Sequence, residues 1–247
     1  MVNKMKDLSF LKSNIISYLG IYDNERIFEN TLQSMMRANK FGYLIQIDVK
    51  ILACGTIICF HDNNLKRLLH VDQELSTITY DELTYMANYQ IPTLKSVLDG
   101  ICGSVPLIIN IDGKINKFFL EKKVMEDLVN YQGQFAIITD NKKRAKWFYK
   151  NYPEVICGYT INSFNYKKPY IIKKYDFLNV DLSLFTDKEI RKLKEDKMVI
   201  GYLIKTREQF NLKTDLCDNL IVDNILEIIE WFVYNKRLRG NIWILFF

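Results

Sequence analysis

Polar side chains that could bind a cation or transfer a proton lie at the ends of several apolar, strand-like runs. Gln46 and Asp48 stand two residues apart in one run, and Asn110 and Asp112 repeat this spacing in a later run. Residues two apart on a strand point to the same face. Four oxygen-bearing side chains that meet at one end of a sheet could hold a hard cation such as Mg²⁺ or Ca²⁺. His61 follows a third run and could transfer a proton beside them.

Each of these residues also has an ordinary structural interpretation. A lone histidine at a strand end is usually a hydrogen-bonded structural residue, and polar pairs on a strand often form a network that lines a barrel. The same holds for the other histidine, His70, which follows a short apolar stretch and is expected at the surface. The individual signals are therefore weak, and their meaning depends on the fold that positions them.

Short apolar runs alternate along the chain with longer amphipathic segments. Runs rich in Ile, Val and Tyr are typical of parallel strands that are buried on both faces. The predicted strands cover residues 15–19, 44–49, 56–60, 107–111, 135–139, 155–159, 177–180, 199–204 and 220–222. The predicted helices cover residues 31–39 after the cap Asn30, then 121–129, 142–149, and 187–193 after the cap Thr186.

This alternation predicts an α/β fold, a TIM-like (β/α)8 barrel built from parallel βαβ units. Nine predicted strands are one more than such a barrel uses, and the gap between residues 49 and 56 is too short for a helix. One of the two flanking strands lies outside the barrel, or a turn at Gly55 joins them. Because no low-complexity segment or Pro/Gly-rich linker divides the chain, we expect a single domain over residues 1–247.

The functional residues of such a barrel lie where its strands end. These positions hold Tyr18, Gly20, Gln46, Asp48, His61, Asp62, Asn110, Asp112, Thr139, Asp140, Tyr202, Lys205 and Asp223.

The composition excludes several classes of protein. With 49% hydrophobic and 26% charged residues among 247, the chain is neither disordered nor collagen-like. The formal net charge of +5 is mild and scattered, so we expect no nucleic-acid partner. The five cysteines lack CxxC spacing, which argues against zinc and disulfides and favours buried, reduced thiols in the cytoplasm. Residues 1–12 do not resemble a signal peptide, and no apolar run reaches the ~18 residues of a membrane helix.

A series of short motifs follows one another in a characteristic order. They are Gly20, Glu29-Asn30-Thr31, Ile45-Gln46-Ile47-Asp48-Val49, His61-Asp62 with the following Arg67, Ile91-Pro92-Thr93-Leu94 and Asn219-Leu220-Ile221-Val222-Asp223. Over about residues 15–228 the chain resembles the glycerophosphodiester phosphodiesterase family, a branch of the phospholipase-C-like phosphodiesterase barrels. Sequences of that family read approximately HRG, ENT, IELDV, DG, HD, IPTL and EIK in this order.

The resemblance implies a barrel that hydrolyses glycerophosphodiesters to glycerol phosphate and an alcohol. In the family, the histidines of HRG and HD act as general acid and base. The Arg of HRG and the Lys of EIK hold the phosphate, while the acids of IELDV and EIK hold one divalent cation.

This chain departs from the family pattern at five site positions. Tyr18 and Leu19 replace the His and Arg of HRG, Gln46 replaces the first metal-binding acid, and Asn110 and Asp112 replace the Glu and Lys of EIK. Only Asp48, His61 and the Glu29 of ENT remain. We expect Glu29 and Asp62 to support the site structurally rather than to react.

Two functional interpretations follow from these departures. In the first, which we favour, hydrolysis is impaired or lost, and the protein binds a small phosphodiester, polyol or phosphate compound, or another protein. In the second, a working metal-dependent phosphodiesterase uses His61 as acid or base, Tyr18 as a hydrogen-bond donor, and Asp48 with Asp112 to hold a cation weakly. A tyrosine pKa near ~10 makes Tyr18 a poor acid–base group, which favours the first interpretation.

The segment 230–247 lies beyond the resemblance and combines aromatic with basic residues. One interpretation is a last helix and tail that pack on the barrel. The other is peripheral membrane contact through residues 231–247, in which aromatic side chains insert and basic side chains face anionic lipid. The sequence sets neither the oligomeric state nor the substrate alcohol.

Overall fold

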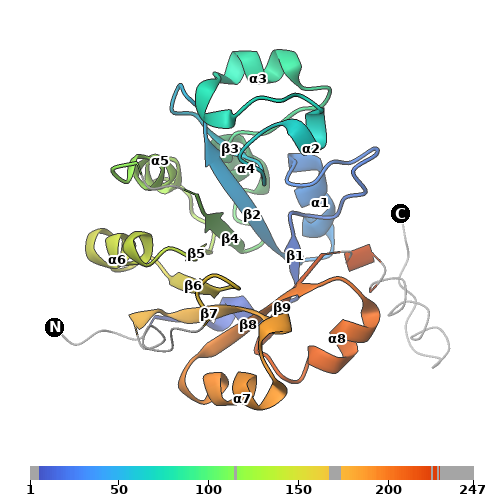
Figure 1. Ribbon diagram of the computed structural model, residues 1–247, viewed down its shortest axis with the longest axis vertical. Helices are drawn as coiled ribbons and strands as arrows, with labels where there is room; N and C mark the ends of the chain where they lie inside the picture. Colours follow the sequence, from blue (N-terminus) through green and yellow to red (C-terminus); the bar gives the residue numbers. More distant parts are fainter. Residues whose placement is uncertain (1–5, 114–115, 167–173, 224, 227, 229–247) are drawn as a thin grey trace.

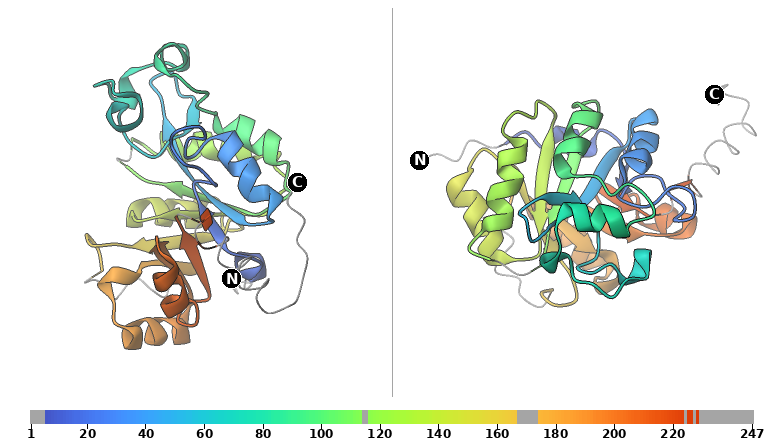
Figure 2. Two further views of the ribbon diagram at one scale, coloured as in Figure 1. Left: turned by 90° about the vertical axis from the view of Figure 1, so that its right-hand side faces the viewer. Right: turned by 90° about the horizontal axis from the view of Figure 1, so that it is seen from above.

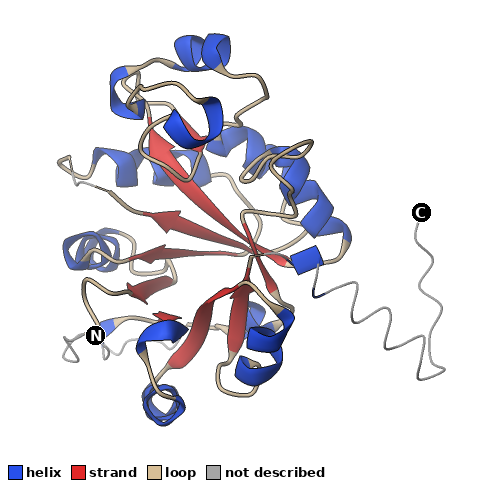
Figure 3. Cartoon of the chain, turned by 45° about the vertical axis from the view of Figure 1, so that its right-hand side comes forward, coloured by secondary structure: helices blue, strands red, loops and turns tan. Residues whose placement is uncertain are grey.

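The computed structural model describes residues 6–113, 116–166, 174–223, 225, 226 and 228. Eight parallel strands close into a barrel in the order β1-β2-β4-β5-β6-β7-β8-β9, because β1 pairs with both β2 and β9. Their bounds are Ile16–Tyr18, Leu44–Ile51, Leu107–Ile111, Phe135–Thr139, Cys157–Ile161, Phe177–Asp181, Met198–Ile204 and Asn219–Val222. The predicted TIM-like (β/α)8 barrel is therefore confirmed (Figure 3).

One of the nine predicted strands, the third along the chain, lies outside the barrel. Strand β3, Ile57–Cys59, pairs antiparallel with β2, with Val49 opposite Cys59, in a hairpin that turns at Gly55. The hairpin is an addition to this βα unit, because helix α4, Leu94–Ile101, still lies between β2 and the next barrel strand, β4. Both predicted alternatives are therefore confirmed. Strand β3 lies outside the barrel, and a turn at Gly55 joins it to β2.

Helices surround the strands, and a small insertion, the segment between β2 and α4 that carries β3, α2 and α3, lies at one end of the molecule (Figure 1). The helices are α1 Leu32–Lys40, α2 Lys66–Leu69, α3 Tyr80–Met86, α4 Leu94–Ile101, α5 Phe119–Leu128, α6 Lys142–Asn151, α7 Asp187–Asp196 and α8 Arg207–Lys213. Short 3-10 turns cover Ser9–Lys12, Leu75–Thr77 and Leu182–Leu184. The four helices predicted from sequence are present, whereas α2, α3, α4 and α8 were not predicted.

The caps of two helices test the sequence analysis in detail. Helix α7 begins after Thr186, whose side chain accepts from the Glu189 amide in a reciprocal capping box, as predicted. Helix α1 does not begin after Asn30. Its cap is Thr31, which forms a capping box with Ser34, and Asn30 is used elsewhere. The cap prediction for Asn30 was wrong because an equally good capping residue directly follows it.

Three apolar clusters hold the fold together. Inside the barrel, side chains of alternate strand positions pack with Phe10 and Leu11 of the first 3-10 turn. A larger cluster lies between the outer faces of the strands and the helices. The insertion has its own core, formed by Leu52, Ile58, Phe60, Leu65, Leu75, Ile78, Leu83 and Ile91. Each fully buried aliphatic side chain contributes roughly 1.5–3 kcal/mol, so this core can hold together the insertion, which projects from one end of the barrel (Figure 2).

The turn after β1 depends on Gly20. Its φ of +87° is a left-handed conformation, and a Cβ built there would lie 2.5 Å from the backbone of Ser34. A side chain at this position would push α1 away from the barrel mouth.

The prediction of buried cysteines is confirmed for three of the five. Cys59, Cys157 and Cys217 are buried free thiols, but Cys54 and Cys102 are exposed, because they lie in turns rather than in strands. No helix among the residues that the structure describes is long and apolar enough to cross a membrane. The membrane contact predicted for residues 231–247 lies outside those residues.

Candidate functional site

The carboxyl ends of β1, β2 and β4 bring four of the predicted residues together. In the barrel register Tyr18 lies beside Gln46, and Asp48 lies beside Asn110. These side chains occupy alternate strand positions that point into the barrel mouth, directly above its apolar interior. The two-residue spacing therefore correctly predicted that Gln46, Asp48 and Asn110 point to one face.

Asp48 is the buried centre of the cluster, with 3% of its side chain exposed. Its Oδ1 accepts hydrogen bonds from Gln46 Nε2 and Asn110 Nδ2, both at 3.1 Å. Its backbone is held by the Asn30 side chain, which donates to the Asp48 carbonyl at 2.8 Å and accepts from the Asp48 amide at 3.3 Å. Burial raises the pKa of Asp48, and the charges of His61 and Lys50 oppose that rise.

His61 reaches the mouth from the end of the β2–β3 hairpin. Its Nε2 lies 3.7 Å from Asp48 Oδ2, and its Nδ1 lies 2.9 Å from Asp62 Oδ1. Asp62 in turn accepts from Arg67 Nε at 2.7 Å. A carboxylate on one imidazole nitrogen fixes the ring orientation and leaves the other nitrogen directed at the mouth.

Glu29 pairs with Arg67, and 6% of its side chain is exposed. It accepts from Arg67 Nη1 at 2.9 Å, from Arg67 Nη2 at 2.5 Å and from Asn24 Nδ2 at 2.9 Å. Its buried carboxylate is thus held by Arg67 and Asn24, which supports a structural role. The role of Arg67 was not predicted, although the sequence places it shortly after the His61-Asp62 pair.

Tyr18 meets His61 edge to face, with 6.2 Å between ring centroids. Burial, followed by the negative charge of Asp48, raises the pKa of Tyr18 well above its ordinary value. The phenol consequently stays neutral near neutral pH. In this neutral form it can donate a hydrogen bond.

Asp112, the fourth predicted cation ligand, does not join Asp48. It forms an ion pair with Lys50 Nζ, from the neighbouring strand β2. The backbone on either side of Asp112 is held by the buried Arg144, which donates to the carbonyls of Ile111 at 3.1 Å and Gly113 at 3.3 Å. Lys50 was missed by the sequence analysis, although it continues the two-residue spacing of Gln46 and Asp48.

The donors present do not fit a divalent-cation site. One buried carboxylate, Asp48, already accepts two amide N–H groups through Oδ1, and the second carboxylate is paired with an ammonium group. Hard cations require several oxygen ligands with enough negative charge to offset their dehydration. No cluster of three or more His, Cys, Asp or Glu side chains suited to a metal occurs in the described part of the chain. In this structure Gln46 and Asn110 donate hydrogen bonds to Asp48, and Asp112 pairs with Lys50.

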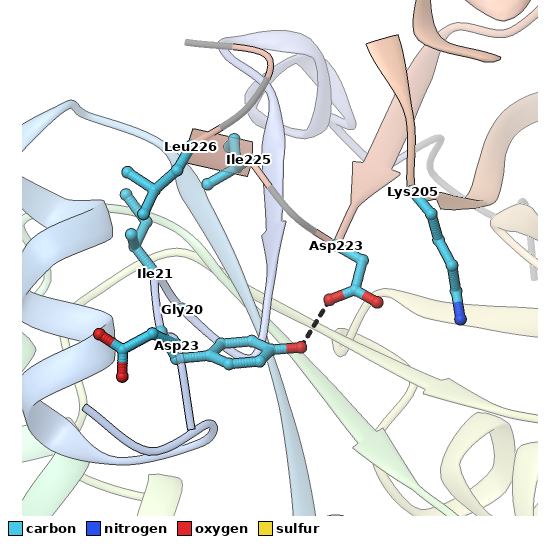
Figure 4. Close-up of a pocket in the computed structure, with 8 residues that line it drawn as sticks. Gly20, Ile21, Asp23, Lys205, Asp223, Ile225 and Leu226 are labelled. Atoms are coloured by element: carbon cyan, nitrogen blue, oxygen red, sulfur yellow. Dashed lines mark hydrogen bonds between the residues drawn. The ribbon is translucent and has the colours of Figure 1, made fainter. Parts of the chain in front are cut away.

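A cavity of about 380 Å³ opens on the other side of the mouth, between the β1–α1 loop and the ends of β8 and β9. Figure 4 shows Asp223 and Lys205 on one wall and Ile21, Ile225 and Leu226 on another. Asp223 accepts a hydrogen bond of 2.5 Å from Tyr22. Tyr22 was not predicted, because it lies in the loop rather than at a strand end.

The chain is thus a parallel barrel with a polar mouth, a histidine that follows a short hairpin, and a small inserted subdomain. The model of the glycerophosphoryl diester phosphodiesterase family matches residues 20–152, more than half of the chain. The chain therefore belongs to this family, as its motifs predicted.

Relatives and solved structures agree with this assignment. Over 158 residues the chain is 28% identical to human "Lysophospholipase D GDPD1", covering 57% of this chain and 48% of the relative. It thus spans about half the length of the curated relatives it matches. The glycerophosphodiester phosphodiesterase of Thermotoga maritima has the same fold, with a TM-score of 0.75, 19% identity, and coverage of 88% of this chain and 98% of that one.

An Oleispira antarctica phosphodiesterase, solved in complex with its product sn-glycerol-3-phosphate, also shares the fold. The TM-score is 0.77 at 18% identity, with 89% of this chain and 96% of that chain covered. At these identities the two solved structures establish the common barrel.

Proposed function

We propose that this protein binds a small phosphate ester at the barrel mouth and hydrolyses glycerophosphodiesters weakly or not at all. Membership of the family supports the ligand class. So does the related Oleispira antarctica phosphodiesterase, whose structure holds sn-glycerol-3-phosphate. The cavity beside the mouth has room for a ligand of this size, since small-molecule pockets typically measure about 300–1,000 Å³.

The environment of Asp48 is the observation that carries the proposal. Its Oδ1 is occupied by the amide donors of Gln46 and Asn110, so the carboxylate is a hydrogen-bonded structural centre. Tyr18, at the position of a family histidine, is a neutral phenol. The second histidine of the family's acid–base pair therefore has no counterpart here, and loss of one acid–base partner removes roughly 10²–10⁴-fold in rate.

The direct experiment measures release of glycerol phosphate from several glycerophosphodiesters in the presence of Mg²⁺, Ca²⁺ or Mn²⁺. We expect wild type to release no more product than the matched variant His61→Ala, while sn-glycerol 3-phosphate still binds in calorimetry. Turnover by wild type that His61→Ala abolishes would show a working enzyme and refute impaired catalysis.

A second candidate function is residual hydrolysis with rearranged roles. The pairing of His61 Nδ1 with Asp62 at 2.9 Å favours it, because an oriented imidazole can act as a general base. In that case Tyr18 would donate a hydrogen bond to the ligand. The variant Asp62→Asn separates the two candidates: it reduces turnover by a working His61, and it leaves a non-catalytic background unchanged.

A further inference from the structure

Lys50 and Asp112 form the next layer of the barrel mouth above Asp48 and Asn110. In the register of β2 and β4, Asp48 lies beside Asn110 and Val49 beside Ile111, so Lys50 and Asp112 follow on the same inward face. The two side chains form an ion pair. Their burial is unequal: 8% of the Lys50 side chain is exposed, against 37% for Asp112.

This inequality determines which partner can leave. The Asp112 carboxylate can turn toward water because it is already partly hydrated, whereas the Lys50 side chain is buried. The Lys50 ammonium stays at the mouth, where it would have lost its ion-pair partner. An unpaired buried ammonium is unfavourable, so an anion that replaces Asp112 at Lys50 would be stabilised there.

The remaining groups around Asp48 also argue against a bound divalent cation. Its Oδ1 accepts two amide donors, and its Oδ2 faces His61 Nε2 at 3.7 Å. A divalent cation would have to displace these donors and coordinate the carboxylate against the nearby Lys50 ammonium. The cationic charge in this layer of the mouth is therefore supplied by the protein itself.

We propose that Lys50 binds the phosphate group of the ligand without a divalent cation, and that Asp112 is the ion-pair partner which the phosphate displaces. This inference rests on the proposed function, since it takes a phosphate ester as the ligand. An ammonium is a compact charge with three rotatable donors, which suits a phosphate oxygen. Asp112 competes with the phosphate for Lys50 and so weakens binding.

Calorimetric titration with sn-glycerol 3-phosphate in EDTA tests the inference. We expect wild type to bind, Lys50→Met to bind about 10- to 100-fold more weakly, and Asp112→Asn to bind more tightly, by about threefold or more. Lys188→Met, which removes the same charge from the exposed surface of α7, should change affinity less than twofold. Circular dichroism confirms that each variant is folded.

The outcomes separate the two proposals. Binding that requires Mg²⁺ or Ca²⁺, or that survives Lys50→Met unchanged, overturns the role of Lys50 and leaves the phosphate-ester ligand intact. Weaker binding by Asp112→Asn also overturns it, even if Lys50→Met does not fold. Absence of binding by wild type both in EDTA and with either metal overturns the ligand class and this inference with it.

Discussion

Arg67 donates two hydrogen bonds to the carboxylate of Glu29, from Nη1 to Oε2 at 2.9 Å and from Nη2 to Oε1 at 2.5 Å. Its third nitrogen, Nε, donates to Asp62 at 2.7 Å. One side chain from the short helix α2 thus joins the insertion to the β1–α1 loop and orients the carboxylate that faces His61. The planar fork of arginine suits this double contact, which lysine cannot reproduce.

Removing the Arg67 fork should loosen the insertion. Arg67→Met leaves the buried Glu29 without its cation, and we expect a loss of about 1–2 kcal/mol in urea unfolding, since the guanidinium is partly exposed. Arg26→Met, a change of the same kind at an exposed loop position, should cost less than about 0.5 kcal/mol. Equal losses in the two variants would show that the Arg67 contact does not stabilise the fold.

Removing one partner of the fully buried ion pair of Arg144 and Glu121 should destabilise the protein strongly. Replacing both residues with apolar ones should destabilise it much less. Arg144 Nε lies 2.5 Å from Glu121 Oε1, and both side chains are 0% exposed. Arg144→Met leaves a buried charge, so we expect a loss of about 3–5 kcal/mol in urea unfolding. The double variant Glu121→Leu/Arg144→Met should recover at least about 2 kcal/mol of this loss. Additive losses would contradict the account.

The stability contributed by Asp62 should depend on pH. Burial would raise the pKa of Asp62, but hydrogen bonds from His61 and Arg67 outweigh it and hold the pKa below the ordinary value. A depressed folded-state pKa stabilises above the unfolded value of about 3.9, and this contribution is lost as pH falls through the folded value. Asp62→Asn should therefore lower the urea midpoint at pH 7, and the difference from wild type should vanish at low pH. A difference that is constant with pH would rule out this contribution.

Restoring carboxylates should create the cation site that the chain lacks. We expect the double variant Gln46→Glu/Asn110→Glu to gain thermal stability with Mg²⁺ or Ca²⁺, by about 2.7 kcal/mol when the cation is 100-fold above Kd. Wild type should show no such gain. A surface control with the same charge change, Asn130→Glu/Gln132→Glu, accounts for non-specific binding. Equal metal responses in wild type and the Gln46/Asn110 variant would contradict our interpretation of the donors.

Much of the fold could be predicted from the sequence because buried parallel strands leave a strong local signal. All nine strands appear in the structure, and the capping box of Thr186 with Glu189 was predicted from its spacing. Helices α2 and α3 were not predicted, because they belong to the insertion, where short segments depend on tertiary packing more than on their own pattern.

The site was predicted less completely, because side-chain partners depend on contacts that the chain makes over long distances. The two-residue spacing placed Gln46 beside Asp48, but it could not show that the amides donate to the carboxylate instead of sharing a cation. Nor could it show that Asp112 pairs with Lys50 from another strand. Residue types and spacing indicate which polar side chains lie close together. Which of them pair with each other depends on charged groups from other parts of the chain.

Binding without cleavage is the central claim, and phosphorus NMR of one sample tests it directly. A glycerophosphodiester is mixed with a slight excess of protein and Mg²⁺, so that even a single slow turnover per molecule becomes visible. We predict that the diester resonance broadens or shifts on binding and keeps its full intensity for hours. Its conversion to a phosphomonoester resonance, faster than in a parallel sample of His61→Ala, would contradict the claim.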